Sequence, residues 1–233
     1  MYQQELLNLV YESRVHILEM LVDRGYNVDQ YKNYTKSEII LILREHSRNK
    51  METKSEVGPL DILVSKNSGS TNDRIEKVYV KYRMDEKFKK TDGLIKQINE
   101  IYDTNILSKT DTVIILNIAN ILLKPGTKDN PNEEFSRQMF VTKGYFVQIF
   151  GLENFKFNVS RNVFVPKHTI MSKSEVDEMM AKYSITDKDN LPTIKVEDPQ
   201  AKYIGLKPHQ VCKINVTNQT SGSSIKYRCC KFY

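Results

Sequence analysis

The sequence predicts two domains, an α/β domain over residues 1–160 and a small α+β domain over residues 161–233. Between residues 61 and 150, strand-like and helix-like segments alternate, which is the order that builds a sheet with crossover helices. The last third contains short helices and ends in two alternating segments joined by a turn, which is typical of a hairpin. With 39% hydrophobic residues in 233, the chain can support two modest cores.

Two helices are expected to open the first domain. Apolar residues spaced by three and four predict a helix over residues 3–24, and Gly25 suits a left-handed C-terminal cap. Thr35 and Glu38 form a capping-box pattern, which predicts a second helix ending at about Arg48.

The sheet of the first domain is expected to follow these helices. Strands are predicted over residues 61–65, 75–83, 111–118 and 145–150, and helices from Thr91 and over residues 133–143. The segment 111–118 is almost entirely β-branched residues and leucine, as expected of a strand buried on both faces.

The second domain has clear helix-start signals. Ser172 and Glu175 form another capping box, and Asp198-Pro199 places an N-cap before a proline at the first helical position. Residues 211–216 and 225–229 alternate as strands, and Ser221-Gly222 provides the turn between them.

Composition limits the cellular compartments and the classes of partner that the chain can have. The N-terminus lacks the apolar stretch of a secretory signal, no apolar run reaches membrane-spanning length, and three cysteines suit a reducing compartment. We therefore expect no membrane partner. Residues 161–233 hold 12 basic and 7 acidic residues, against 23 and 22 in residues 1–160. This basic balance is compatible with a polyanion partner, although solvated helix and strand faces are the favoured explanation of the charge alone.

Motifs for cofactor and metal chemistry are missing. No glycine-rich phosphate loop or nucleophile elbow occurs, so we expect no cofactor. The strongest zinc pattern is His209 and Cys212 with Cys229-Cys230. Adjacent strand residues point to opposite faces, so the two last cysteines cannot easily share one ion, and packing as small hydrophobes is the favoured interpretation.

An incomplete nuclease pattern lies in the first domain. Restriction-type nucleases hold Mg²⁺ through an aspartate before one strand and an acidic-x-Lys triplet on the next. Asp61 and Lys81 are suitably placed, but Tyr79 occupies the position where the second carboxylate belongs. The pattern supports at most an inactive nuclease-like scaffold, and a metal-dependent nuclease using Asp61 and Lys81 stays as an alternative.

The last third carries a set of short motifs in a fixed order. They are Val165-Pro166-Lys167-His168, Ser172-Lys173-Ser174-Glu175, Leu191-Pro192, Asp198-Pro199, Tyr203-x-Gly205-x-Lys207, Thr220-Ser221-Gly222 and Tyr227-Arg228. Over about seventy residues this order resembles the fifth-largest subunit shared by eukaryotic RNA polymerases I, II and III, whose archaeal counterpart consists of this segment alone. Residues 19–26 are similar to the first helix and turn of the eukaryotic subunit.

The resemblance implies a non-catalytic polymerase subunit with two parts. Its C-terminal assembly domain would dock on the largest subunit, among the other polymerase subunits, and its nuclease-like mixed-sheet N-terminal jaw would lie near downstream duplex DNA. It implies a nuclear protein in a cell, or a virion or viral-factory protein if the source is a large DNA virus. The residues expected at the docking surface are Pro166, His168, Pro192, Asp198, Pro199, Tyr203, Gly205, Thr220, Gly222, Tyr227 and Arg228.

The jaw departs from the family pattern at one place. After the strand 111–118 the family carries a Thr-Pro-Ser-Ala element near DNA, where this chain has residues 119–125 without that motif. Arg83, Lys87, Lys89 and Lys90 form a basic cluster that could contact DNA backbone, and a solvated loop is the other interpretation. An adaptor outside polymerase is the second alternative function.

Overall fold

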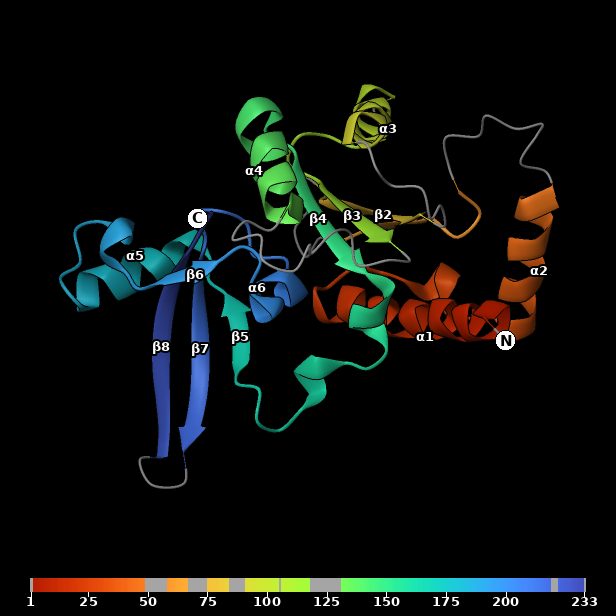
Figure 1. The fold of residues 1–233 in the computed structure, drawn as a ribbon. Coiled ribbons are helices and arrows are strands. Elements are labelled where there is room, and N and C mark those ends of the chain that lie inside the picture. The colour runs from red at the N-terminus through yellow and green to blue at the C-terminus, as the bar shows by residue number, and fades with distance from the viewer. Residues whose placement is uncertain are drawn as a thin grey trace. The chain divides into compact units, whose positions relative to one another are not determined.

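The chain is divided into two compact units, Met1–Phe157 and Asn158–Tyr233, called here the N-terminal and C-terminal units. The structure is a computed structural model that describes residues 2–48, 58–66, 75–83, 91–104, 106–117, 131–218 and 222–232. Each unit has its own four-stranded sheet (Figure 1). This agrees with the predicted pair of an α/β and an α+β part.

The sheet of the N-terminal unit is mixed, with the strand order β1-β2-β3-β4. Its strands are β1 (Ile62–Ser65), β2 (Lys77–Arg83), β3 (Thr112–Asn117) and β4 (Phe146–Gly151). β1 is antiparallel to β2, while β2, β3 and β4 are parallel. Parallel neighbours need crossover connections, and α3 (Thr91–Asp103) and α4 (Pro131–Lys143) are the helices between them.

Helices cover both faces of this sheet. α3 and α4 lie on one face (Figure 1), where Leu94, Ile98 and Phe135 pack against Tyr79 and strand residues of β3 and β4. α1 (Tyr2–Asp23) lies on the other face and packs against the 3₁₀ turn η3 (Leu152–Phe155). Every residue of β3 and β4 is buried, so the prediction of a strand buried on both faces is confirmed for β3.

Both predicted signals at the N-terminal helices are confirmed. Gly25 follows α1 with a φ of 89°, a left-handed conformation that favours glycine. The turn η1 (Asp29–Tyr31) leads towards α2 (Lys36–Arg48). The Thr35 N–H donates to Glu38 Oε2 at 2.7 Å, and the Glu38 N–H donates to Thr35 Oγ1 at 3.3 Å, which completes the capping box.

The sheet of the C-terminal unit has the order β5-β7-β8-β6. β7 (Val211–Asn218) and β8 (Gly222–Lys231) form the predicted hairpin, β5 (Lys167–Ile170) pairs antiparallel with β7, and β6 (Thr193–Lys195) pairs parallel with β8. The sequence did not predict β5. The other elements of this unit are η4 (Val159–Arg161), α5 (Lys173–Lys182), η5 (Lys188–Asn190) and α6 (Pro199–Ile204).

A small core holds this unit together. Val176 and Met179 of α5 pack on Leu191, Val211 and Cys229. The capping box predicted before α5 is present, with the Ser172 side chain accepting from the Glu175 N–H and the Glu175 side chain accepting from the Ser172 N–H. In the described parts of the chain, no helix combines the length and the apolar character needed to cross a membrane.

Candidate docking surface

Helix α6 is defined by its two ends. Asp198 Oδ1 accepts the N–H groups of Gln200 at 2.9 Å and Ala201 at 3.2 Å, and Pro199 occupies the first turn. At the other end Gly205 has a φ of 72°, and the Leu206 N–H donates to the Ala201 carbonyl at 2.9 Å. The predicted cap geometry of Asp198, Pro199 and Gly205 is confirmed, and their role in docking stays a prediction.

The side chains of α6 hold the loop that precedes β5. Tyr203 Oη accepts a hydrogen bond from Asn158 Nδ2 at 3.0 Å, and Ser160 Oγ donates to Gln200 Oε1 at 3.2 Å. Asn158 also caps η4 by accepting the Ser160 N–H at 3.1 Å. The loop between residues 158 and 166 is therefore connected to α6 by side-chain hydrogen bonds as well as by the chain itself.

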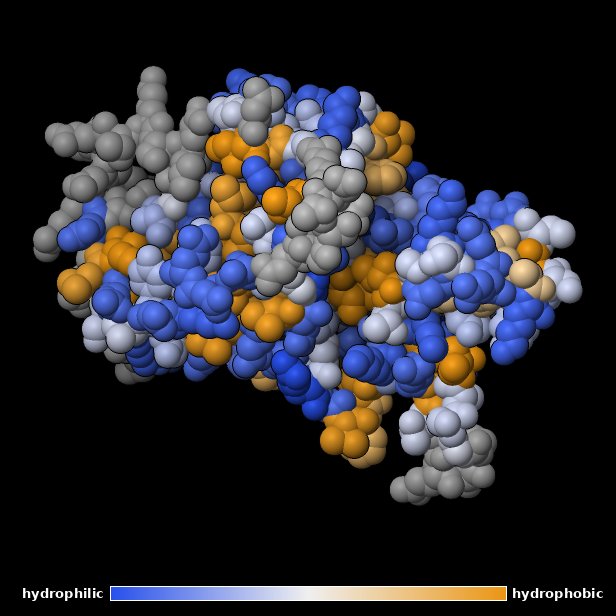
Figure 2. Space-filling model, turned by 180° about the vertical axis from the view of Figure 1, so that it is seen from behind, coloured by the Kyte–Doolittle hydropathy of each residue, from blue (hydrophilic) through white to orange (hydrophobic). Residues whose placement is uncertain are grey.

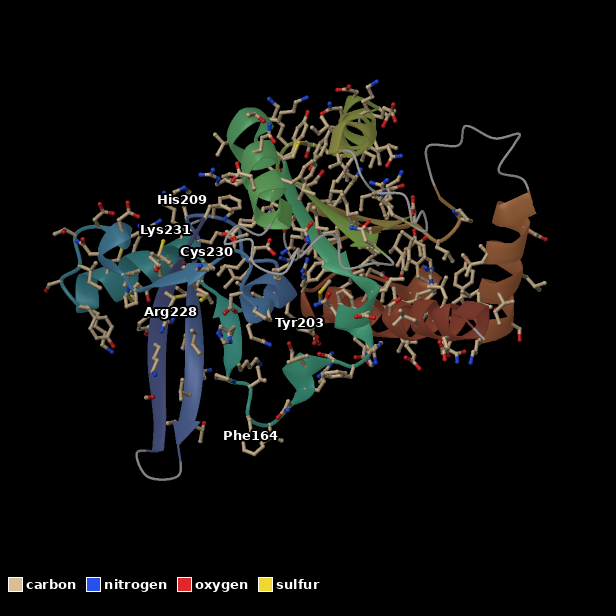
Figure 3. The ribbon with its side chains drawn as sticks, in the orientation of Figure 1. Phe164, Tyr203, His209, Arg228, Cys230 and Lys231 are labelled. Carbon is tan, nitrogen blue, oxygen red and sulfur yellow. The ribbon has the colours of Figure 1, made fainter. Side chains whose placement is uncertain are left out.

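This loop displays two large apolar side chains. Val163 is 95% exposed and Phe164 is 92% exposed, the highest values for large hydrophobics among the described residues. The N–H groups of Phe164 and Val165 donate to the side chain and carbonyl of Asn162, both at 3.0 Å, so the turn has a defined shape. Figure 3 labels Phe164 at the end of this loop, and Figure 2 shows a hydrophobic knob there. We call this pair the Val163–Phe164 tip.

Sequence reasoning did not single out the Val163–Phe164 tip. The available signal was an apolar pair directly after Asn162, a residue that favours turns. A pair of large apolar residues on a turn has few neighbours to pack against, and its exposure suggests an external contact.

Three predicted residues, Pro166, His168 and Pro192, have mainly local roles near β5 and β6. The His168 Nδ1 atom bonds the Pro166 carbonyl at 2.7 Å, with His168 in β5 opposite Ile214 of β7. The Pro192 carbonyl accepts the Cys229 N–H at 2.9 Å, which starts the pairing of β6 with β8. Both prolines and His168 thus shape the backbone beside the sheet.

The last predicted pair lies on β8. Arg228 Nη1 donates to the Thr193 carbonyl at 2.8 Å. The ring centroids of Tyr227 and Tyr183 are 5.9 Å apart. Gly222 begins β8 with a φ of 70°. Thr220 lies outside the described residues.

The cysteines are packed in the sheet. Cys229 belongs to the core beside α5, whereas Cys230 Sγ is 3.8 Å from the Leu206 carbonyl and the backbone of Cys230 bonds His209 and Gln210. Burial raises the pKa of Cys212 to about 11 and that of Cys230 to about 12. Within the described residues no group of three or more histidine, cysteine or acidic side chains could hold a metal ion.

His209 adopts an unusual backbone conformation, with a φ of 64°. Its N–H donates to the Cys230 carbonyl at 2.9 Å, while the Cys230 N–H donates to the Gln210 carbonyl, also at 2.9 Å. His209 and Gln210 therefore both pair with the single residue Cys230, which forms a β-bulge just before β7. Figure 3 labels His209 beside Cys230 and Lys231 at this end of the sheet.

Asp61 has a structural role in place of the metal-binding role that the nuclease alternative required. Its Oδ2 atom accepts from Tyr79 Oη at 2.6 Å and from the Gly58 N–H at 2.7 Å, and its Oδ1 accepts the Tyr82 N–H at 2.9 Å. Burial, and then the negative charge of Asp61, raise the pKa of Tyr79, which keeps this donor protonated. Tyr79 thus fills the second-carboxylate position with a phenol that binds the first carboxylate.

The predicted DNA-contact cluster is only partly within the described residues. Arg83 is the last residue of β2 and is half-buried. Lys87, Lys89 and Lys90 lie outside the described residues, as do residues 119–125, where the family motif is missing.

Known proteins match the C-terminal unit and, at lower identity, nearly the whole chain. The family model described as RNA polymerase Rpb5, C-terminal domain, matches residues 157–230. A DNA-directed RNA polymerase subunit Rpo5 from Archaeoglobus fulgidus is 42% identical over 73 residues, which are 31% of this chain and 95% of that protein. The Methanosarcina mazei Rpo5 is 44% identical over 73 residues, which are 31% of this chain and 92% of that protein.

Eukaryotic relatives extend the match into the N-terminal unit. The Caenorhabditis elegans subunit RPABC1 of DNA-directed RNA polymerases I, II and III is 28% identical over 217 residues, covering 92% of each chain. The Arabidopsis thaliana subunit 5C of DNA-directed RNA polymerase V is 26% identical over 219 residues, covering 94% of this chain and 82% of that protein. The archaeal proteins are matched over almost their whole length and the eukaryotic ones over almost all of this chain. The chain therefore belongs to the Rpb5 family and is a non-catalytic subunit of a DNA-directed RNA polymerase.

Proposed function

We propose that the C-terminal unit docks this chain on the largest subunit of its polymerase. The observation that carries the proposal is that the archaeal Rpo5 proteins are matched over nearly their full length by this unit. A polymerase subunit of that size has little else with which to join the complex. The face that carries the Val163–Phe164 tip and α6 is the best candidate surface, because its apolar side chains are exposed while its backbone is held by hydrogen bonds.

Affinity purification tests the docking. A tagged full-length chain expressed in its own host should recover the two largest polymerase subunits. The variant Phe164→Ser removes an exposed aromatic anchor without opening a core cavity, and it should lower recovery at least about tenfold.

Val141→Ser is the matched control for this variant. Val141 lies on α4 of the N-terminal unit and is 74% exposed, so its replacement should leave recovery unchanged. Recovery of wild-type chain without the large subunits would overturn the docking and favour an adaptor outside polymerase.

We further propose that the N-terminal unit forms part of the jaw around downstream duplex DNA, and that a eukaryotic cell carries this subunit in its nucleus. Contacts would be made to the DNA backbone by cations such as Arg83, Lys87, Lys89 and Lys90. Support comes from the eukaryotic relatives, whose similarity spans this unit.

The proposed DNA interaction has a quantitative signature. Polymerase assembled with Lys87, Lys89 and Lys90 changed to alanine should hold DNA with a weaker salt dependence, the log–log slope falling by about 0.9 for each phosphate interaction that the change removes. Alanine at Lys143, Lys156 and Lys188, lysines elsewhere on the chain, gives the charge-matched control. Equal slopes of log affinity against log salt for both triple variants would show that the basic cluster does not contact DNA.

A further inference from the structure

One edge of the C-terminal sheet is open along most of β8. β8 pairs with β7 over its length from Gly222 to Cys229, but β6 reaches it only at residues 229–231. Residues 222–226 are exposed. On the side away from β7, the segment 222–228 has no neighbouring strand among those that the structure describes.

The hydrogen bonds at the end of β8 show which backbone groups face this open edge. The Cys229 N–H donates to Pro192 on the β6 side, whereas the Cys230 N–H and carbonyl bond residues next to β7. Directions alternate along a strand, so Ser223, Ile225 and Tyr227 turn both N–H and carbonyl groups outward. We call this row the outer edge of β8. An open row of donors and acceptors is a template for another strand.

Apolar side chains lie next to the outer edge. Ile225 is 51% exposed and shares a face of β8 with Tyr227. The ring centroid of Tyr227 is 5.9 Å from that of Tyr183. Tyr183 is itself 52% exposed. Soluble proteins usually protect such an edge with charge, proline or a covering element. β8 carries Lys226 and Arg228, but the exposed Ile225 beside them gives the edge an apolar side chain on which another strand can pack.

We propose that the outer edge of β8 binds an extended segment of another polymerase subunit as an added strand, with the Tyr183–Tyr227 pair contacting its side chains. The inference rests on the proposed docking to polymerase and adds a second contact, on the side of the sheet away from β5 and the Val163–Phe164 tip. Backbone hydrogen bonds would supply affinity, and alternate side chains of the added strand would supply specificity.

Charge indicates the chemistry of that segment. β8 contains Lys226, Arg228 and Lys231 and no acidic residue. A second copy of β8 would bring like charges together, whereas a strand carrying aspartate or glutamate would pair with them. The expected partner is therefore an extended, acid-bearing segment and not a second copy of this chain.

Ile225→Pro in the full-length chain tests the inference. Proline at residue 225 removes one outward N–H and leaves the bonds between β8 and β7, which are made by the even-numbered residues of β8. Thr217→Pro is the matched control. Thr217 lies opposite Ser223 on the same hairpin, and its N–H faces the other edge of the sheet.

Tagged wild-type and variant chains are expressed in the host, and the two largest polymerase subunits are measured after purification. We expect Ile225→Pro to lower their recovery at least about tenfold and Thr217→Pro to leave it within about twofold of wild type. Equal recovery for both variants overturns the added strand while leaving the docking intact. Absence of both large subunits from the wild-type sample overturns the docking itself.

Hydrogen exchange distinguishes a broken interface from an unfolded chain. In wild-type chain, the amides of Ser223, Ile225 and Tyr227 should exchange rapidly in the isolated subunit and slowly within assembled polymerase. The same fast exchange in both samples overturns the inference whatever the variants do. If the isolated chain already protects these amides and sediments as a dimer, the occupant is a second copy and the proposed partner is wrong.

Discussion

At the residue scale, the clearest feature is a carboxylate that a motif search would assign to catalysis. Asp61 is 9% exposed, and three donors from Gly58, Tyr79 and Tyr82 surround it at 2.6–2.9 Å. A Cβ added to Gly58 would be 3.0 Å from Asp61 Oδ1, so the turn before β1 leaves little room for any side chain other than that of glycine at residue 58. The carboxylate therefore joins the turn to β2.

Replacement of Asp61 should destabilise the N-terminal unit. Asp61→Ala leaves the Tyr79 hydroxyl and the Tyr82 N–H buried without their acceptor, which we expect to cost about 2–5 kcal/mol in total. Hydrogen exchange followed by mass spectrometry would show faster opening of β1 and β2 with no change beyond residue 158. Lys81→Ala should have an effect under about 1 kcal/mol. Magnesium-dependent DNA cleavage by wild type that Asp61→Ala abolishes would contradict this role.

Two buried thiols make stability depend on alkaline pH. Burial raises the pKa of Cys212 from 9.0 to about 11 and that of Cys230 from 9.0 to about 12. Between the unfolded pKa and the folded pKa of each thiol, the folded chain therefore binds more protons than the unfolded chain. Their stabilising contribution is complete below pH 9 and is lost as the pH rises towards 11–12. The urea midpoint should fall over this range, and less steeply in the Cys212→Ala/Cys230→Ala variant. Identical slopes would show that the thiols do not contribute.

At the element scale, α6 shows how short a helix can be when both ends are satisfied. Six residues are too few for a helix that is stable by itself. The Asp198 cap, Pro199 and the left-handed Gly205 satisfy its termini, and Lys202 forms a largely buried ion pair with Glu197 at 2.8 Å. The helix in turn holds the loop of the Val163–Phe164 tip through Tyr203 and Gln200.

Removal of either α6 cap should weaken this unit. Asp198→Ala leaves two N–H groups without their acceptor and should cost about 1 kcal/mol. Gly205→Ala places a Cβ in the left-handed region at a cost of about 1–2 kcal/mol. Asp177→Ala, at an exposed position within α5, is the control. Urea denaturation of residues 158–233 measures all three, and equal midpoints for the cap variants and wild type would contradict the argument.

Elements with strong local signals could be predicted, and those created by tertiary contacts could not. The boxes at Thr35 and Ser172 and the buried run of β3 are encoded within a few residues. β5 is a four-residue strand with largely exposed side chains, so it lacks an alternating pattern. The left-handed His209, the parallel pairing of β6 with β8 and the Asp61–Tyr79 bond all depend on residues distant in sequence.

At the scale of the whole molecule, the chain joins a unit that matches archaeal subunits to an N-terminal unit matched by eukaryotic relatives. Each unit has its own sheet, and the division after Phe157 coincides with the start of the family match at residue 157. Docking and DNA contact are therefore expected to be separable functions. Net charge does not mark the proposed DNA-contacting part, because residues 161–233 hold 12 basic and 7 acidic residues and residues 1–160 hold 23 and 22, so that local clusters and not net charge must make the contact.

Separate expression of the two units tests this division. Residues 158–233 should fold with cooperative urea unfolding and recover the two largest polymerase subunits as well as the full-length chain does, because the matched archaeal subunits are about this unit alone. Residues 1–157 should recover neither. Polymerase assembled with the short fragment should release downstream DNA at lower salt than polymerase with the full chain. If the short fragment is folded and fails to recover the large subunits, the docking surface must include the N-terminal unit.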